Sequence, residues 1–177
     1  MRRAAYWGWE SVEERAGDGA VSSVQRARFG RPVVSFSDEG ARHLSSTYWR
    51  EVERSTLRLV RATGPARGVS LLAFGRGPVL LRFGPAEITA TPTEVRCGHA
   101  IVGGLLARKA SGEIRFEQRV QDDGVLVISA ISGFHPTLAA RPGMPAWTGE
   151  LYKGVQSRLH VLVGRRYFDC LAQEGRG

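Results

Sequence analysis

Lysine and cysteine are both scarce in this chain of 177 residues. The two lysines are Lys109 and Lys153, so 23 of the 25 basic residues are arginine. The two cysteines, Cys97 and Cys170, are too few and too far apart to form a disulfide scaffold. Two buried thiols in a reducing compartment are the simpler interpretation, so we expect a cytoplasmic protein.

Long apolar runs are also missing. No stretch approaches the 18 apolar residues that a membrane-spanning helix needs, so we expect no transmembrane segment. The charged start Arg2-Arg3 is followed by Glu10, Glu13 and Glu14 rather than by the apolar region of a signal peptide.

The positive charge is large but dispersed. A net charge of +8 would suit nucleic acid, an anionic membrane surface or an acidic ligand. The longest adjacent basic groups are only the pairs Arg2-Arg3 and Arg165-Arg166, and no helix-turn-helix, paired zinc-ligand set or aromatic RNA-binding signature accompanies them. A GC-rich genome produces such an arginine surplus without selection for a ligand. We therefore do not expect nucleic acid to be the partner.

Motifs that would identify a reaction are absent. The four histidines, His43, His99, His135 and His160, lack the clustering of a zinc site, and no glycine-rich segment has the pattern of a phosphate-binding loop. We therefore expect neither metal nor cofactor and assign no catalytic residue. Whether the protein is an enzyme stays open at this point, as does assembly into a homo-oligomer.

What is present is a series of strands between two helices. Ser37 and the acids after it predict a helix start, and helical spacing continues to about Arg54. A second amphipathic helix is predicted from Glu150 to Gln173, after a proline-rich loop. The predicted strands are 31–36, 57–61, 69–74, 79–83, 87–91, 113–120 and 125–131, with a long bent strand or two short ones over 93–108, where three glycines occur.

The first 30 residues differ from the rest. Tyr6, Trp7 and Trp9 form an aromatic cluster too apolar for a solvated tail, so we expect it to pack back on the domain or to cover a partner. We accordingly divide the chain into an aromatic-bearing N-terminal extension, 1–30, and a single domain, 31–177.

Two segments indicate how the sheet is buried. In 113–120 the residues Ile114, Phe116, Gln118 and Val120 alternate with charged residues, which predicts one buried and one solvated face. The segment 125–131 is apolar on both faces, which predicts a central strand.

This element order resembles the helix-grip fold of the START, pollen-allergen and polyketide-cyclase (SRPBCC) superfamily. The residues that carry the resemblance are Val33 to Phe36, the helix from Asp38, the meander Leu57 to Ile131 and the apolar positions from Leu151 to Leu162. The resemblance implies an α+β fold in which a curved antiparallel β-sheet of about six to seven strands is wrapped around a long C-terminal helix. It also implies an apolar ligand between sheet and helix. A calycin-like barrel fits the meander too, but the long terminal helix favours the helix-grip arrangement.

Six residues are candidates for contact with a ligand. His99 and Gln118 are polar groups on predicted inward faces, and Arg166 falls in the middle of the predicted apolar face of the last helix. Each also has an ordinary structural interpretation, as a satisfied core group or a snorkelling side chain. The candidates are Trp49, His99, Phe116, Gln118, Tyr152 and Arg166.

Three functions follow from these observations. The first is binding of a small, largely apolar ligand in a cavity between the sheet and the C-terminal helix. The second is a cyclase- or lyase-type enzyme that uses His99, Arg166 or another polar cavity group for proton transfer. The third is a protein or nucleic-acid interaction module that uses the basic surface and the Tyr6/Trp7/Trp9 segment.

Overall fold

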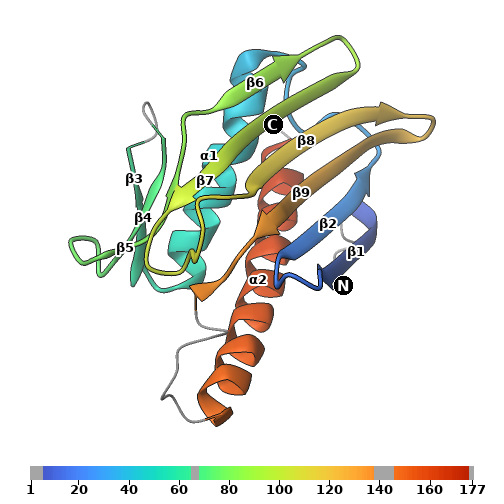
Figure 1. Ribbon diagram of the computed structural model, residues 1–177. Helices are drawn as coiled ribbons and strands as arrows, with labels where there is room; N and C mark the ends of the chain where they lie inside the picture. Colours follow the sequence, from blue (N-terminus) through green and yellow to red (C-terminus); the bar gives the residue numbers. More distant parts are fainter. Residues whose placement is uncertain (1–5, 65–67, 138–145, 176–177) are drawn as a thin grey trace.

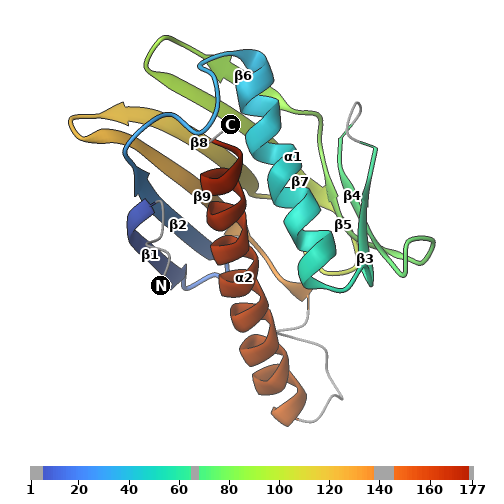
Figure 2. The ribbon, with the colours of Figure 1, turned by 180° about the vertical axis from the view of Figure 1, so that it is seen from behind.

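The structure is a computed structural model, and it describes residues 6–64, 68–137 and 146–175; within 146–159 it describes the backbone alone. An antiparallel sheet carries both described helices on one face, where they lie side by side (Figures 1 and 2). This confirms the predicted α+β fold class and the helix-grip-like arrangement of a sheet against a long C-terminal helix. Neither helix is long and apolar enough to cross a membrane, judged on the described residues.

The sheet has nine strands in the described residues, two more than the upper end of the expected range. Their order is β1-β2-β9-β8-β7-β5-β4-β3, and β6 pairs with the first half of β7. All pairs are antiparallel and the sheet does not close. The strands are β1 (Tyr6–Arg15), β2 (Val21–Phe29), β3 (Val60–Thr63), β4 (Ser70–Ala73), β5 (Val79–Phe83), β6 (Glu87–Ala90), β7 (Glu94–Gly103), β8 (Glu113–Gln121) and β9 (Gly124–Phe134).

Two helices cover the sheet. Helix α1 (Asp38–Ser55) begins as predicted, because the Ser37 hydroxyl accepts a hydrogen bond from the Gly40 amide and two acids occupy its first turn. It lies over β6, β7 and β8, whereas the end of helix α2 (Ala146–Glu174) lies over β1 and β2 (Figure 2).

The N-terminal residues belong to the sheet. Strand β2 pairs with β9 along most of its length, and β1 pairs with β2, so the boundary at residue 30 does not set a separate extension apart from the sheet. The sequence did not predict strand β2 because its inward positions include Ser23 and Gln25, which are buried although they are polar. Apolar alternation, on which the strand prediction depends, is therefore broken.

The predicted strand at 31–36 is wrong. Residues 30–37 connect β2 to α1, and the backbone amides of Val33 and Val34 are bound by the carboxamide oxygen of Gln118 at 2.7 and 3.1 Å. A side chain thus supplies the hydrogen bonds that a neighbouring strand would give.

The strand predicted at 57–61 begins later, at Val60. Leu57 and Arg58 adopt left-handed backbone conformations, with φ of 51° and 62°, which residues other than glycine do not adopt in a regular strand. The bend predicted in the long strand is confirmed, since β7 ends at Gly103 and both Gly103 and Gly104 have φ above 100°.

A layer of aromatic side chains forms the core between sheet and helices. Tyr48 of α1 packs on Phe116 of β8 with ring centroids 4.8 Å apart, and on Tyr167 of α2 at 5.6 Å. Phe168 joins Tyr167 to Phe29 of β2. One contiguous cluster therefore ties both helices to the centre of the sheet.

The outer face of the sheet is less polar than the alternation in 113–120 predicted. Leu126, Ile128 and Ala130 of β9 are buried there, and β9 lies between β2 and β8, so the central strand predicted at 125–131 is confirmed. Arg28 and Arg119 stand directly opposite Leu126 on the two neighbouring strands, and Ile128 and Ala130 each face one arginine, Arg26 and Arg115. Their aliphatic stems can cover the apolar stripe while the charged ends stay in water.

Replacement of Gly164 by alanine should destabilise the fold, although alanine is the better helix former. An added Cβ would overlap the carboxamide of Gln25, which is fully buried on β2. We expect a loss of about 1–3 kcal/mol in the free energy of unfolding, measured by urea denaturation. Gly17→Ala, where the added Cβ meets no atom, is the control. A Gly164→Ala protein as stable as the control would contradict the close packing of α2 on β2.

Candidate functional site

A groove runs along α1, and its main hollow has a volume of about 310 Å³. A second hollow of about 240 Å³ shares Ser46, Trp49 and Val69 with the first, so the two form one groove, the α1 groove. The lining of the main hollow comes from α1, from β7 and from the residues just before β4 and β6: Glu39, Arg42, His43, Ser45, Ser46, Trp49, Val69, Ala86, Cys97 and His99.

A directed chain of hydrogen bonds lies at the base of this groove. His99 Nδ1 is 3.0 Å from the Gly84 carbonyl oxygen, and a carbonyl can only accept, so Nδ1 carries the proton. The Ser45 hydroxyl lies 2.9 Å from His99 Nε2 and donates to it. Trp49 Nε1 in turn donates to Ser45 Oγ over 2.9 Å. Ser45 also has a side-chain hydrogen bond to Cys97.

The protonation states at the base of the groove follow from burial. Desolvation lowers the pKa of His99, against the opposing effect of its hydrogen bond to Gly84. The imidazole is therefore neutral at pH 7, as the hydrogen-bond directions require. Desolvation likewise raises the pKa of Cys97, whose sulfur lies 3.6 Å from His99 Nε2, so Cys97 is a thiol.

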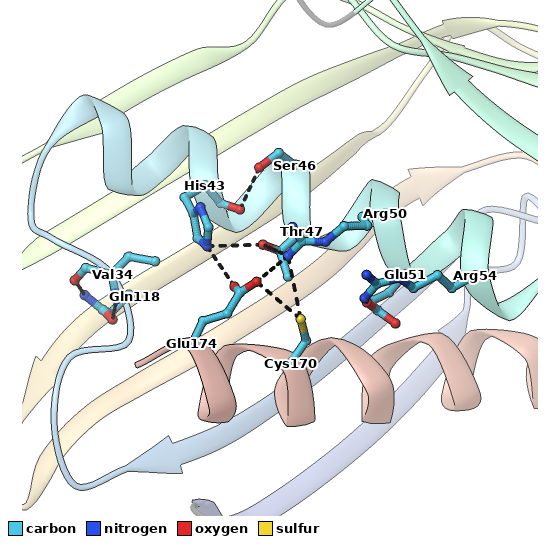
Figure 3. A network of polar contacts seen from close by, with 10 residues as sticks. All are labelled: Val34, His43, Ser46, Thr47, Arg50, Glu51, Arg54, Gln118, Cys170 and Glu174. Atoms are coloured by element: carbon cyan, nitrogen blue, oxygen red, sulfur yellow. Dashed lines mark hydrogen bonds and ion pairs between the residues drawn. The ribbon is translucent and has the colours of Figure 1, made fainter. Parts of the chain in front are cut away.

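The mouth of the groove is charged, and a polar network beside it holds the two helices together (Figure 3). Glu174 of α2 accepts from Arg50 at 2.6 Å and pairs with His43 at 2.9 Å, both on α1. Arg50 also reaches Thr47 and Cys170. Partial burial works to raise the pKa of Glu174, but the His43 and Arg50 contacts outweigh it and lower the pKa.

Two of the six predicted ligand residues meet in this groove. Trp49 and His99 both line it, and their rings lie 6.0 Å apart. Phe116 is fully buried among Tyr48, Trp49 and Tyr167, so it belongs to the core. Phe116 therefore has the surroundings of an ordinary packed core residue.

Gln118 is also a structural residue. It is fully buried, its oxygen accepts from the Val33 and Val34 amides, and its nitrogen donates to the Val34 carbonyl at 2.9 Å (Figure 3). These bonds fix the connection between β2 and α1, and they engage both the oxygen and the nitrogen of the carboxamide.

The predicted face of the last helix is wrong near its end. Arg166 is exposed and does not line the α1 groove, whereas Phe168, two positions further on, is fully buried. The buried positions are Val163, Gly164, Tyr167, Phe168, Leu171 and Ala172. The predicted apolar face followed the apolar residues in the first half of the helix. In the second half, the contact of Gly164 with β2 determines which face is buried. The Tyr152 side chain lies outside the described part.

In the described part of the interface between the sheet and the C-terminal helix, packed aromatic side chains fill the centre. Phe29, Phe116, Tyr167 and Phe168 pack there. A separate hollow of about 280 Å³ lies at the end of α2, against residues 29–33.

Two of the three N-terminal aromatics, Tyr6 and Trp9, pack back on the domain, as one of the two alternatives predicted, whereas Trp7 is 47% exposed. Tyr6 donates to Asp169 at 3.0 Å, and burial together with this bond raises its pKa to about 12. The Arg165 guanidinium lies 4.6 Å from the centroid of the Trp9 ring. His135 pairs with Asp18 and Ser111 outside the α1 groove.

Sequence reasoning missed Ser45, Arg42 and Cys97, although a signal existed. Ser45 and Trp49 are spaced i, i+4 on a helix, and Cys97 and His99 are spaced i, i+2 on a strand, so each pair shares one face. What the spacing could not supply was that the two faces oppose each other. Within the described residues, no cluster of three or more potential metal ligands occurs.

Comparisons with known proteins add little beyond this geometry. No family model matches the chain, and a search of curated proteins finds no match. The crystal structure of CalU16 from Micromonospora echinospora is similar over 96% of this chain and 98% of that chain, with 13% identity and a TM-score of 0.32. The crystal structure of Ara h 8.0201 is similar over 90% of this chain and 98% of that chain, with 14% identity and a TM-score of 0.35.

The stability of the protein should fall as the pH is lowered through about 6.5, the ordinary histidine value. Burial lowers the pKa values of both His99 and His160, so the unfolded chain binds more protons than the folded one in this window. The free energy of unfolding therefore rises with pH there. His99→Gln should reduce this slope in urea denaturation at a series of pH values. A slope equal to that of the unsubstituted protein would contradict a neutral, buried His99.

Replacement of Gln118 by methionine should cost about 2–5 kcal/mol of unfolding free energy, because it leaves two amides and one carbonyl without partners at a buried site. Gln121→Met on the same strand, where the side-chain oxygen has no hydrogen-bond partner, is the matched control. Equal midpoints for the two variants would show that Gln118 does not fix the connection.

Proposed function

We propose that this protein binds a small, largely apolar molecule in the α1 groove, with one polar group of the ligand directed at Ser45. The observation that carries the proposal is the Trp49–Ser45–His99–Gly84 hydrogen-bond chain at the base of a hollow of about 310 Å³. This volume is at the lower end for small-molecule sites, which are typically apolar with few polar groups.

The composition of the groove supports this class of ligand. Trp49, Val69 and Ala86 supply apolar surface, and His99 is held neutral. Since the Ser45 hydroxyl proton is engaged by His99, Ser45 can meet a ligand only as an acceptor, in place of its contact with Cys97. The favoured ligand therefore carries a hydroxyl or an N–H donor on an apolar body.

The location differs from the one that the fold resemblance implied. An apolar ligand between the sheet and the second half of α2 would have to displace packed aromatic rings. The α1 groove needs no such rearrangement, which favours a site between α1 and β7.

The cyclase- or lyase-type alternative receives less support. It named His99, Arg166 or another polar cavity group for proton transfer, and Arg166 is exposed outside the groove that His99 lines. The interaction-module alternative loses its aromatic segment, because Tyr6 and Trp9 are engaged with α2. A cytoplasmic location and the oligomeric state remain predictions.

A bulky side chain at Ala86 should block binding. Candidates are found by a thermal-denaturation screen of fatty acids, hydroxylated fatty acids and aromatic polyketides, and hits are confirmed by calorimetry. We expect Ala86→Phe to abolish the ligand-dependent rise in Tm, because Ala86 lines the hollow. Ser45→Ala should weaken binding of a hydroxylated ligand by about 2- to 10-fold, the effect of one hydrogen bond.

Ala90→Phe serves as the control, since Ala90 is exposed on β6 and does not line the groove. Binding that survives in Ala86→Phe as well as in Ala90→Phe would place the ligand elsewhere. Absence of any hit in the screen would overturn the proposal for these ligand classes.

A further inference from the structure

Three large apolar side chains project from the edge of the molecule formed by β3, β4 and β5. Leu57 is 85% exposed, Phe74 is 78% exposed and Leu59 is 55% exposed. The Phe74 amide donates to the Leu59 carbonyl over 2.6 Å, so these apolar residues are neighbours. In Figure 1 this edge lies at the left, away from the β1 edge of the sheet.

Two of these three residues have an unusual backbone conformation. Leu57 and Phe74 have φ of 51° and 53°, and Arg58 between the leucines has φ of 62°. These are the positive-φ residues other than glycine in the described part of the chain. Left-handed leucine and phenylalanine are strained, and such strain concentrates at functional positions.

Arginines surround the apolar tips. Arg58, Arg61 and Arg76 line one hollow together with Phe74. None of the ion pairs among the described residues involves these three guanidinium groups. The acid in the lining, Glu53, accepts from the Ala62 amide at 2.8 Å. The patch formed by Leu57, Leu59, Phe74, Arg58, Arg61 and Arg76 is named the β3–β5 tip.

We propose that the β3–β5 tip docks on an anionic lipid surface. Apolar side chains would enter the boundary between headgroups and acyl chains, while the arginines pair with lipid phosphates and carboxylates. The two leucines distinguish this from a nucleic-acid surface, because leucine offers neither a stacking plane nor a phosphate contact. The site is separate from the α1 groove proposed above, so either proposal can fail without the other.

The test is co-sedimentation of the full chain with vesicles of phosphatidylcholine and phosphatidylserine, compared with vesicles of phosphatidylcholine alone. We expect binding to the mixed vesicles, with weakening at high salt because charge interactions are screened. The substitutions Leu57→Asn and Phe74→Asn suit the left-handed backbone, so thermal denaturation should show folds at least as stable as the original. Phe74→Asn should reduce partitioning by at least about tenfold.

Arg58→Gln, Arg61→Gln and Arg76→Gln should each weaken binding by about fivefold. The controls are Leu162→Gln and Arg166→Gln, which remove an exposed apolar side chain and an exposed charge from α2. Equal losses in tip and control variants, equal binding to both kinds of vesicle, or binding to DNA or RNA without binding to vesicles would each overturn the proposal.

Discussion

The packing of Tyr48 and Trp49 on the sheet is the interaction on which the rest of the structure depends. Both of these adjacent residues of α1 contact Phe116 of β8. Trp49 also contacts Phe83 of β5, and Tyr48 also contacts Tyr167 of α2, so a single helical turn links two strands and the second helix. Since aromatic side chains bury large apolar areas, this turn fixes where α1 lies on the sheet. It also fills the space beside α2 in which a ligand was expected.

The candidate site is a consequence of that placement. With Trp49 turned toward Phe83, its indole N–H faces back along α1 to Ser45, and Ser45 faces His99 on β7. Each polar group in this buried chain of hydrogen bonds has a partner, which is the condition for keeping a serine and a histidine among apolar residues.

The structure shows where the surplus arginines lie on the surface, which composition alone could not indicate. Part of it flanks the buried apolar stripe on the outer face of β9, where Arg28 and Arg119 stand opposite Leu126. Another part gathers at the β3–β5 tip around exposed Leu57 and Phe74. Residues dispersed in the sequence are thus concentrated on the surface by the hairpins that bring strands together.

By itself the sequence determined the helix that Ser37 caps, the strands of the meander with clear alternation or turn signals, and the α+β class, because these depend on local periodicity and turn chemistry. It could not reveal β2, whose buried Ser23 and Gln25 are matched to His160 on a distant helix. Nor could it place Gln118, which replaces a strand by binding Val33 and Val34. Only the tertiary structure decided which face of α2 is buried and that Ser45 meets His99, since both depend on contacts between residues far apart in the chain.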